Sequence, residues 1–187
     1  MDYELIRSGR RTIAVQVGEA GHVTVRAPLR MPTREIDAFV TAHAEWIRRH
    51  REQRRSREAA AQTIALTPKL TACLKEQGKQ ALPKLVWKWA ELLGVTPAGI
   101  TLTNAATRWG SCGANGRICL SVRALLLPER CLEYIVVHEL AHLKEHNHSA
   151  RFYAVVERVM PDWRERFAQI REFERTHRVT SVYKRAE

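Results

Sequence analysis

Residues 138–142 read His-Glu-Leu-Ala-His, a spacing that is suited to metal chemistry. On a helix, residues four apart lie one turn above each other on the same face, so His138 and His142 can both reach one ion at about 2.0–2.1 Å. Glu139 stands next to the first histidine and can face an open coordination position, where it would take a proton from a water molecule. The motif predicts a zinc-dependent hydrolase with Glu139 as its general base.

The residues before the motif place it on a buried helix. Ile135, Val136 and Val137 form an apolar run directly before His138. Unpaired histidines are costly in such surroundings, because their polar atoms lose water without gaining a partner. The context therefore favours metal binding over a helix that carries histidines by accident.

A third metal ligand is expected, since catalytic zinc keeps three protein ligands and one open position. If the helix simply continued, His146 would lie about 12 Å from His138, too far to share one ion. His148 follows an asparagine, which favours the end of a helix, and stands six residues past His142, the offset of the third histidine in metzincins. A downstream acid such as Glu157 is the alternative. We predict that His138, His142 and His148 bind the metal.

A second segment, from Arg108 to Ser111, carries residues that suit substrate binding. Gly110 would let a ligand or a backbone approach closely, and Arg108 can pair with a carboxylate or a phosphate. The alternatives are that Trp109 belongs to the core and that Arg108 pairs with a structural acid. We treat Arg108, Trp109, Gly110 and Ser111 as candidate substrate-binding residues. Cys112 could be a nucleophile, but a metal site makes one unnecessary.

The first 62 residues are predicted to form a β-meander and a basic helix. Alternation at period two over residues 3–27 predicts small antiparallel strands, and an amphipathic pattern begins at Thr33. The pattern runs into six arginines over Arg48–Arg57, where the apolar stripe disappears. That stretch is either a projecting basic helix or a linker. Its arginines could bind phosphates, but a solvated face is the more common reading.

Residues 63–187 are predicted to form the metal-dependent hydrolase domain, and we expect both segments to make one compact unit. A helical region at 67–93, with a break near its glycine and proline, precedes a strand that reaches residue 109 and a hairpin turn at 113–116. The helix that carries the motif starts at Pro128, and two more are expected near 149–159 and 161–177. The mixture of elements predicts an α+β fold.

Composition narrows the class of protein. With 187 residues, 45% of them hydrophobic and 27% charged, the chain is typical of a folded globular protein. The N-terminus lacks the apolar segment of a signal peptide, and no run is long enough to span a bilayer. The four cysteines form no closely spaced pair, which favours free thiols over disulfides or a zinc finger. We expect a soluble, cytoplasmic protein without a membrane partner.

Several of these segments together resemble the YgjP-like metallopeptidase family, whose members are distant relatives of the SprT-like and WLM zincins. The resemblance is strong over residues 100–165 and is carried by Thr107–Cys112, Gly116, Ile118, Leu120, Pro128, Tyr134–Leu143, Asn147–Ser149 and Phe152. It implies a zincin-like fold, zinc bound by His138, His142 and His148, and catalysis by Glu139. Ser121 stands where the family commonly has asparagine, and residues 63–66 stand in place of a Tyr-Leu-Gly strand.

Three functions follow as hypotheses. The leading one is a zinc metallopeptidase that cleaves a peptide or protein substrate with zinc-activated water. The same site could hydrolyse a nucleotide phosphoanhydride, which suits a chain with a net charge of +11. A protein associated with nucleic acid through Arg48–Arg57, with protease activity, is the third. The oligomeric state and the physiological substrate stay open.

Overall fold

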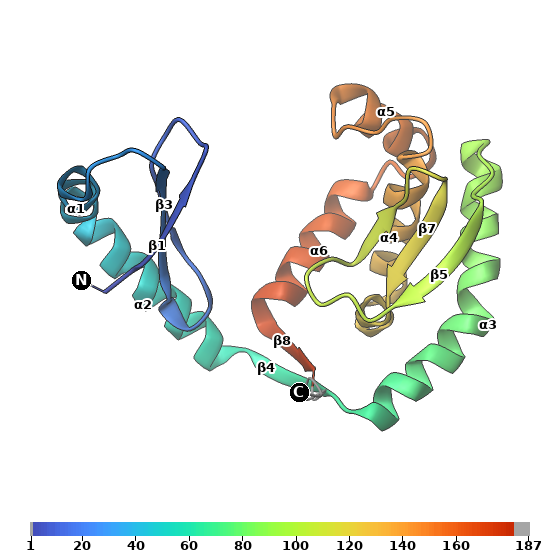
Figure 1. The fold of residues 1–187 in the computed structure, drawn as a ribbon. Coiled ribbons are helices and arrows are strands. Elements are labelled where there is room, and N and C mark those ends of the chain that lie inside the picture. Colours follow the sequence, from blue (N-terminus) through green and yellow to red (C-terminus); the bar gives the residue numbers. More distant parts are fainter. Residues whose placement is uncertain (1, 182–187) are drawn as a thin grey trace. The chain divides into compact units, whose positions relative to one another are not determined.

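The computed structural model describes residues 2–181 and divides into two compact units, Met1–Gln62 and Thr63–Glu187. The expectation of one compact unit is therefore wrong, although the boundary lies at the expected residues. Each unit contains helices, strands and a hydrophobic core of its own (Figure 1). The predicted α+β class is therefore confirmed. Within the described range, no helix combines the length and the apolar character that crossing a bilayer requires.

The first unit is built on a three-stranded sheet. Its strands are β1 (Glu4–Ser8), β2 (Ala14–Val17) and β3 (Val23–Pro28), in the order β1-β3-β2. β2 pairs with β3 in antiparallel fashion, but β1 pairs with β3 in parallel, so the predicted antiparallel meander is wrong. Alternation at period two predicts which face of a strand is buried, whereas it does not identify the neighbouring strand.

Two consecutive helices, α1 (Thr33–Ala42) and α2 (Ala44–Ala60), complete the first unit, with a break at His43. The basic stretch is helical throughout, so the linker reading is wrong and the helix reading is confirmed. Ile47, fully buried, is the one buried residue of α2, which explains why the apolar stripe ends there.

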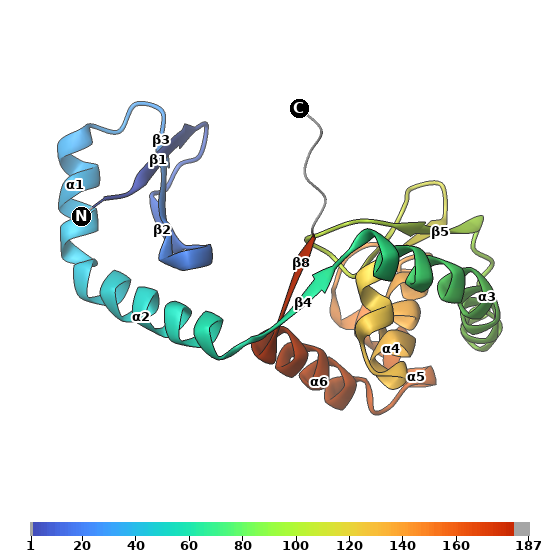
Figure 2. The ribbon, with the colours of Figure 1, turned by 90° about the horizontal axis from the view of Figure 1, so that it is seen from below.

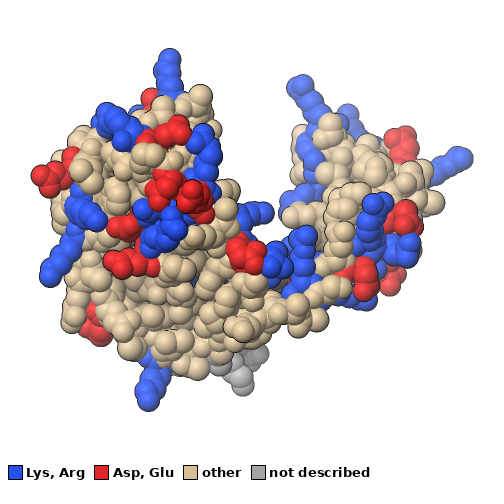
Figure 3. Space-filling model, turned by 180° about the vertical axis from the view of Figure 1, so that it is seen from behind, with Lys and Arg blue, Asp and Glu red and all other residues tan. Residues whose placement is uncertain are grey.

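Positive and negative side chains are mixed on one face of the second unit (Figure 3). On its face drawn in Figure 3, Lys and Arg side chains are interspersed with Asp and Glu. In the first unit, two of the α2 arginines pair with acids of the same helix: Arg48 with Glu45 at 2.8 Å and Arg54 with Glu58 at 3.4 Å. Exposed pairs of this kind contribute little to stability, and they reduce the net charge of the helix surface.

The second unit opens with β4 (Gln62–Leu66), which pairs with β8 (His177–Ser181), and with the long helix α3 (Pro68–Leu93). The predicted break in α3 is wrong, because the helix continues through Gly78 and Pro83. A Cβ at Gly78 would lie 2.9 Å from a Leu125 methyl group, so the glycine allows close packing.

A second three-stranded sheet lies next to the motif. It contains β5 (Gly99–Thr103), β6 (Gly110–Cys112) and β7 (Arg117–Ser121), in the order β5-β7-β6. The hairpin between β6 and β7 is as predicted, and β5 runs parallel to β7. The strand predicted up to residue 109 ends at Thr103, and a loop leads from there to β6. The short strand β6 forms an edge of this sheet.

Helix α4 (Glu129–Ala141) carries the motif and packs against the sheet of β5, β6 and β7 (Figures 1 and 2). It also contacts α3, α5 (Ala150–Val159) and α6 (Trp163–Thr176). Nine of its thirteen residues are buried. A helix held on so many sides gives its side chains fixed directions, which a metal site requires.

Candidate metal centre

Three imidazoles converge at the end of α4. One ring nitrogen from each of His138, His142 and His148 lies within 4.8 Å of the other two. The ring centroids form a nearly equilateral triangle with sides of 5.0, 4.9 and 4.7 Å. The Nε2 atoms of His138 and His148 face each other at 2.9 Å. Two nitrogens bound to one tetrahedral ion would lie roughly 3.3 Å apart, so the arrangement is close to that of a metal site.

The path of the chain explains why the His148 imidazole lies beside the other two. The helix ends at Ala141, with His142 as its C-terminal cap, and the chain turns before α5 begins at Ala150. His148 lies in this turn and reaches back to the other two histidines. Within residues 2–181, His146 and Glu157 are not part of the group, and Glu157 pairs with Arg164 at 2.6 Å.

Phe152 contacts all three imidazoles. Its side chain is fully buried, and its ring centroid lies 4.9, 4.6 and 4.9 Å from those of His138, His142 and His148. Phe152 lies in the first turn of α5, and His148 lies in the turn just before this helix. A rigid aromatic contact shared by all three rings restricts their rotation.

Hydrogen bonds and burial prepare two of the imidazoles to bind a cation. His142 Nδ1 lies 3.1 Å from the backbone carbonyl oxygen of Glu145, to which a protonated Nδ1 donates, and this leaves Nε2 with its lone pair. His138 Nδ1 lies 3.5 Å from the Tyr134 hydroxyl. Burial, together with the neighbouring histidines, lowers the pKa of His138 to about 4, so its ring is neutral at pH 7. Neutral imidazole is the form that binds metals.

Glu139 lies buried beside the imidazoles, with only 7% of its surface exposed. Burial raises the pKa of its carboxyl group to about 7, against the opposing effects of the Arg108 charge and of a hydrogen bond from the Cys112 backbone amide. Gly110 leaves the space that this side chain occupies, because a Cβ there would lie 2.7 Å from Glu139 Cγ. A carboxyl group with a pKa near 7 can both accept and return a proton.

Of the four candidate substrate-binding residues, one packs against the core and the others lie near Glu139 or on strand β6. Trp109 packs against Phe173 and donates its indole N–H to Glu174 at 2.9 Å, which supports the core interpretation for this residue. Arg108 is exposed, and its charge acts on Glu139. Gly110 and Ser111 lie on the edge strand β6, where Gly110 contacts Glu139 directly.

Three groups around the histidines were not assigned a role from the sequence: the Tyr134 hydroxyl, the Glu145 carbonyl and the Phe152 ring. The signal for one of them was present as helical spacing, since Tyr134 precedes His138 by four residues on α4. The Glu145 carbonyl had no signal, because any residue offers a backbone oxygen.

A helix with an HExxH motif, three converging imidazoles and a buried glutamate is the arrangement of metal-dependent hydrolases. Comparison with known protein families supports this class of protein. A family described as YgjP-like, metallopeptidase domain, matches residues 11–67 and 57–173. The chain belongs to this family of metallopeptidases, and the resemblance seen in the sequence is confirmed.

The chain was also compared with curated proteins and with solved structures. No curated protein is significantly similar to the chain. Among solved structures, the chain is similar to the metallopeptidase zymogen of Pyrococcus abyssi abylysin, with 27% sequence identity and a TM-score of 0.46, covering 51% of this chain and 98% of that chain.

Proposed function

We propose that the protein is a zinc metallopeptidase in which His138, His142 and His148 hold the ion and Glu139 is the general base. The observation that carries this proposal is the buried Glu139 carboxyl group beside three converging imidazoles. Family membership supports the peptidase class.

Zinc fits this set of donors. Imidazole nitrogens are among its usual ligands, and a site with three protein ligands leaves one position open. His142 is oriented by its hydrogen bond to the Glu145 carbonyl, and His138 is neutral because it is buried. When bound, the ion would lower the pKa of a water molecule to about 7 and polarise a carbonyl group.

The residues of the chain then have distinct tasks. The edge strand β6 offers backbone groups to an extended peptide, which would add to the sheet as a further strand. Glu139 takes the proton from the attacking water and delivers it to the leaving amine. Arg108, exposed and close enough for its charge to act on Glu139, lies where it can bind a carbonyl or carboxylate oxygen of the substrate.

The direct test is cleavage of peptides by purified, zinc-loaded protein. We expect peptide hydrolysis that is abolished by a chelator and restored by zinc, and about one zinc ion per chain by elemental analysis. Nucleoside triphosphates are assayed in parallel under the same conditions. Hydrolysis of nucleotides without any cleavage of peptides would contradict the proposal.

The contact between Gly110 and Glu139 predicts that Gly110→Ala impairs catalysis without removing the metal. The new Cβ would lie 2.7 Å from Glu139 Cγ, so the carboxyl group must move. A displacement of about 1 Å of a reacting group can reduce the rate by about 10²-fold. We therefore expect kcat to fall by about that factor and the zinc content to stay close to that of the wild type, while overpacking of the buried site lowers the thermal midpoint.

Gly9→Ala is the matched control, because a Cβ there meets nothing within 4 Å. It should leave kcat unchanged. Wild-type kcat in Gly110→Ala would show that Glu139 does not depend on the space at this position.

A further inference from the structure

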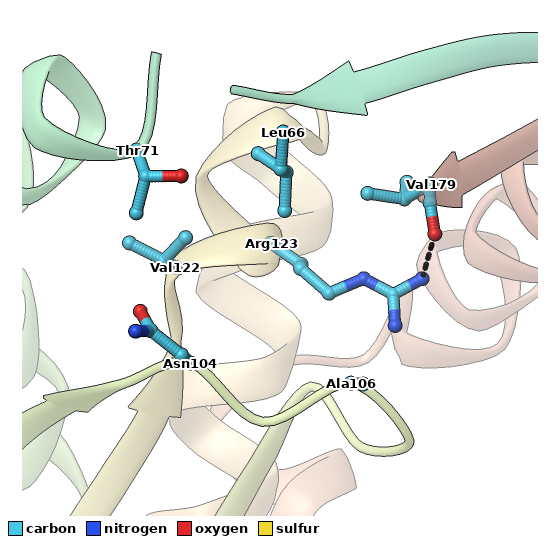
Figure 4. Close-up of a pocket in the computed structure, with 7 residues that line it drawn as sticks. All are labelled: Leu66, Thr71, Asn104, Ala106, Val122, Arg123 and Val179. Carbon is cyan, nitrogen blue, oxygen red and sulfur yellow. Dashed lines mark hydrogen bonds between the residues drawn. The ribbon is translucent and has the colours of Figure 1, made fainter. Parts of the chain in front are cut away.

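A pocket in the second unit shares no lining residue with the metal centre. It lies where β4, the beginning of α3 and β8 meet the loop that follows β5 (Figure 4). Its empty volume is about 340 Å³, part of which is open solvent, so its ligand is small. Leu66, Val122 and Val179 provide much of an apolar wall, and none of the described residues that line it is acidic.

One polar atom of this wall is buried without a hydrogen bond. Thr71 is 3% exposed, and its Oγ1 has no partner among the described residues. The hydroxyl group points into the space between Leu66 and Val122 (Figure 4). Buried hydroxyl groups are almost always paired, because an unpaired one has lost its water without compensation. A ligand with an acceptor atom at this point would supply the missing partner.

The pocket that Thr71 faces has a positively charged side chain in its lining. Arg123 lines the pocket, and its Nη2 donates to the Val179 carbonyl oxygen at 3.4 Å. Its guanidinium also lies over the Trp109 ring, 5.7 Å from the centroid, so its orientation is restrained. Thr71 itself belongs to the beginning of the 26-residue helix α3, whose N-terminal end carries a partial positive charge. Asn104 also lines the pocket and provides a side-chain amide.

We infer that this pocket binds a small aliphatic carboxylate. One carboxylate oxygen accepts a hydrogen bond from the Thr71 hydroxyl, and Arg123 balances the negative charge. The aliphatic group contacts Leu66 and Val122. Such a ligand has two sources, a free short-chain acid or the C-terminal residue of a peptide. The inference does not depend on the proposed catalytic function, because it concerns other residues and is tested by binding.

The ligand class is tested by titrating the zinc-loaded protein with isovalerate and with its neutral analogue isovaleramide, while amide resonances are followed by NMR. We expect saturable shifts at Thr71, Val122 and Val179 with isovalerate, and affinity at least about tenfold lower for isovaleramide, since hydrogen bonds to charged groups are the stronger ones. Equal affinity for both compounds, or no saturable shift with isovalerate, would overturn the inference.

Thr71→Val tests the role of the hydroxyl group, with Thr63→Val on the exposed part of β4 as the matched control. We expect Thr71→Val to weaken isovalerate binding about tenfold or more while its thermal midpoint stays equal or rises, because a buried unpaired hydroxyl is removed. Thr63→Val should bind isovalerate as the wild type does.

N-acetylleucine and its amide distinguish the two sources of the ligand. Shifts with N-acetylleucine but not with its amide identify a peptide C-terminus, and shifts with isovalerate alone identify a free acid. Wild-type isovalerate affinity in Thr71→Val would refute the inferred site.

Discussion

Glu139→Gln should keep its zinc and lose peptidase activity by about 10²- to 10⁴-fold, the range that a general base typically contributes. Glutamine has nearly the same shape as glutamate and can occupy the space beside Gly110, so the buried site keeps its packing. It cannot take a proton from water at neutral pH. The measurement is kcat for peptide hydrolysis, together with the zinc content of the same sample.

A matched control is available in Glu157→Gln. Glu157 is exposed, pairs with Arg164 and does not belong to the group of three histidines. It was also the alternative third ligand, so this variant tests two assignments at once. We expect wild-type activity and zinc content. Unchanged turnover in Glu139→Gln would remove Glu139 from the mechanism, and loss of zinc in Glu157→Gln would reopen the ligand assignment.

His148→Ala should weaken zinc binding by more than about 100-fold, beyond the loss of 10–100-fold that is typical of groups that only orient a ligand. The variant leaves two imidazoles, so water would have to replace the third. His148 also contacts Phe152, and alanine removes that ring contact without unfolding the buried part of the site, because the His148 side chain is exposed. Zinc affinity is measured by competition with a chelator.

His146→Ala is the control for this experiment. His146 lies in the same turn and is exposed, and it is outside the group of three. We expect its zinc affinity to stay close to that of the wild type. If His146→Ala lost the metal and His148→Ala kept it, the proposed ligand set would be wrong.

The parts of the site that are close in the sequence were predictable. The spacing of His138 and His142 defines one face of a helix, and that geometry holds wherever a helix forms. The apolar run at 135–137 indicated that this helix is buried, and the structure places it in the core. The prediction of His148 as the third ligand required only that the chain turn back after α4, and a short turn is enough for this.

Strand pairing was not predictable in the same way. Alternation showed strands in the first unit, but β1 lies parallel to β3 and not in a meander. The pattern of one strand records which of its faces is buried, whereas the choice of neighbour depends on residues that are far away in the chain. The predicted break in α3 was wrong for a similar reason. Gly78 and Pro83 lower the helix propensity locally, but α3 packs against Leu125 and Leu102, and this packing keeps the helix continuous.

The amino-acid sequence was sufficient for the metal motif, its helix, the candidate ligands and the family, because each depends on local spacing. The surroundings of Glu139 depend on the fold. Gly110 and the Cys112 amide come from β6, a separate strand that reaches Glu139 only when the sheet packs against α4. Burial by that packing raises the pKa of Glu139 to about 7. The unpaired hydroxyl of Thr71 likewise becomes visible only when β4, α3 and β8 enclose it, since partners and burial are properties of residues brought together from distant parts of the chain.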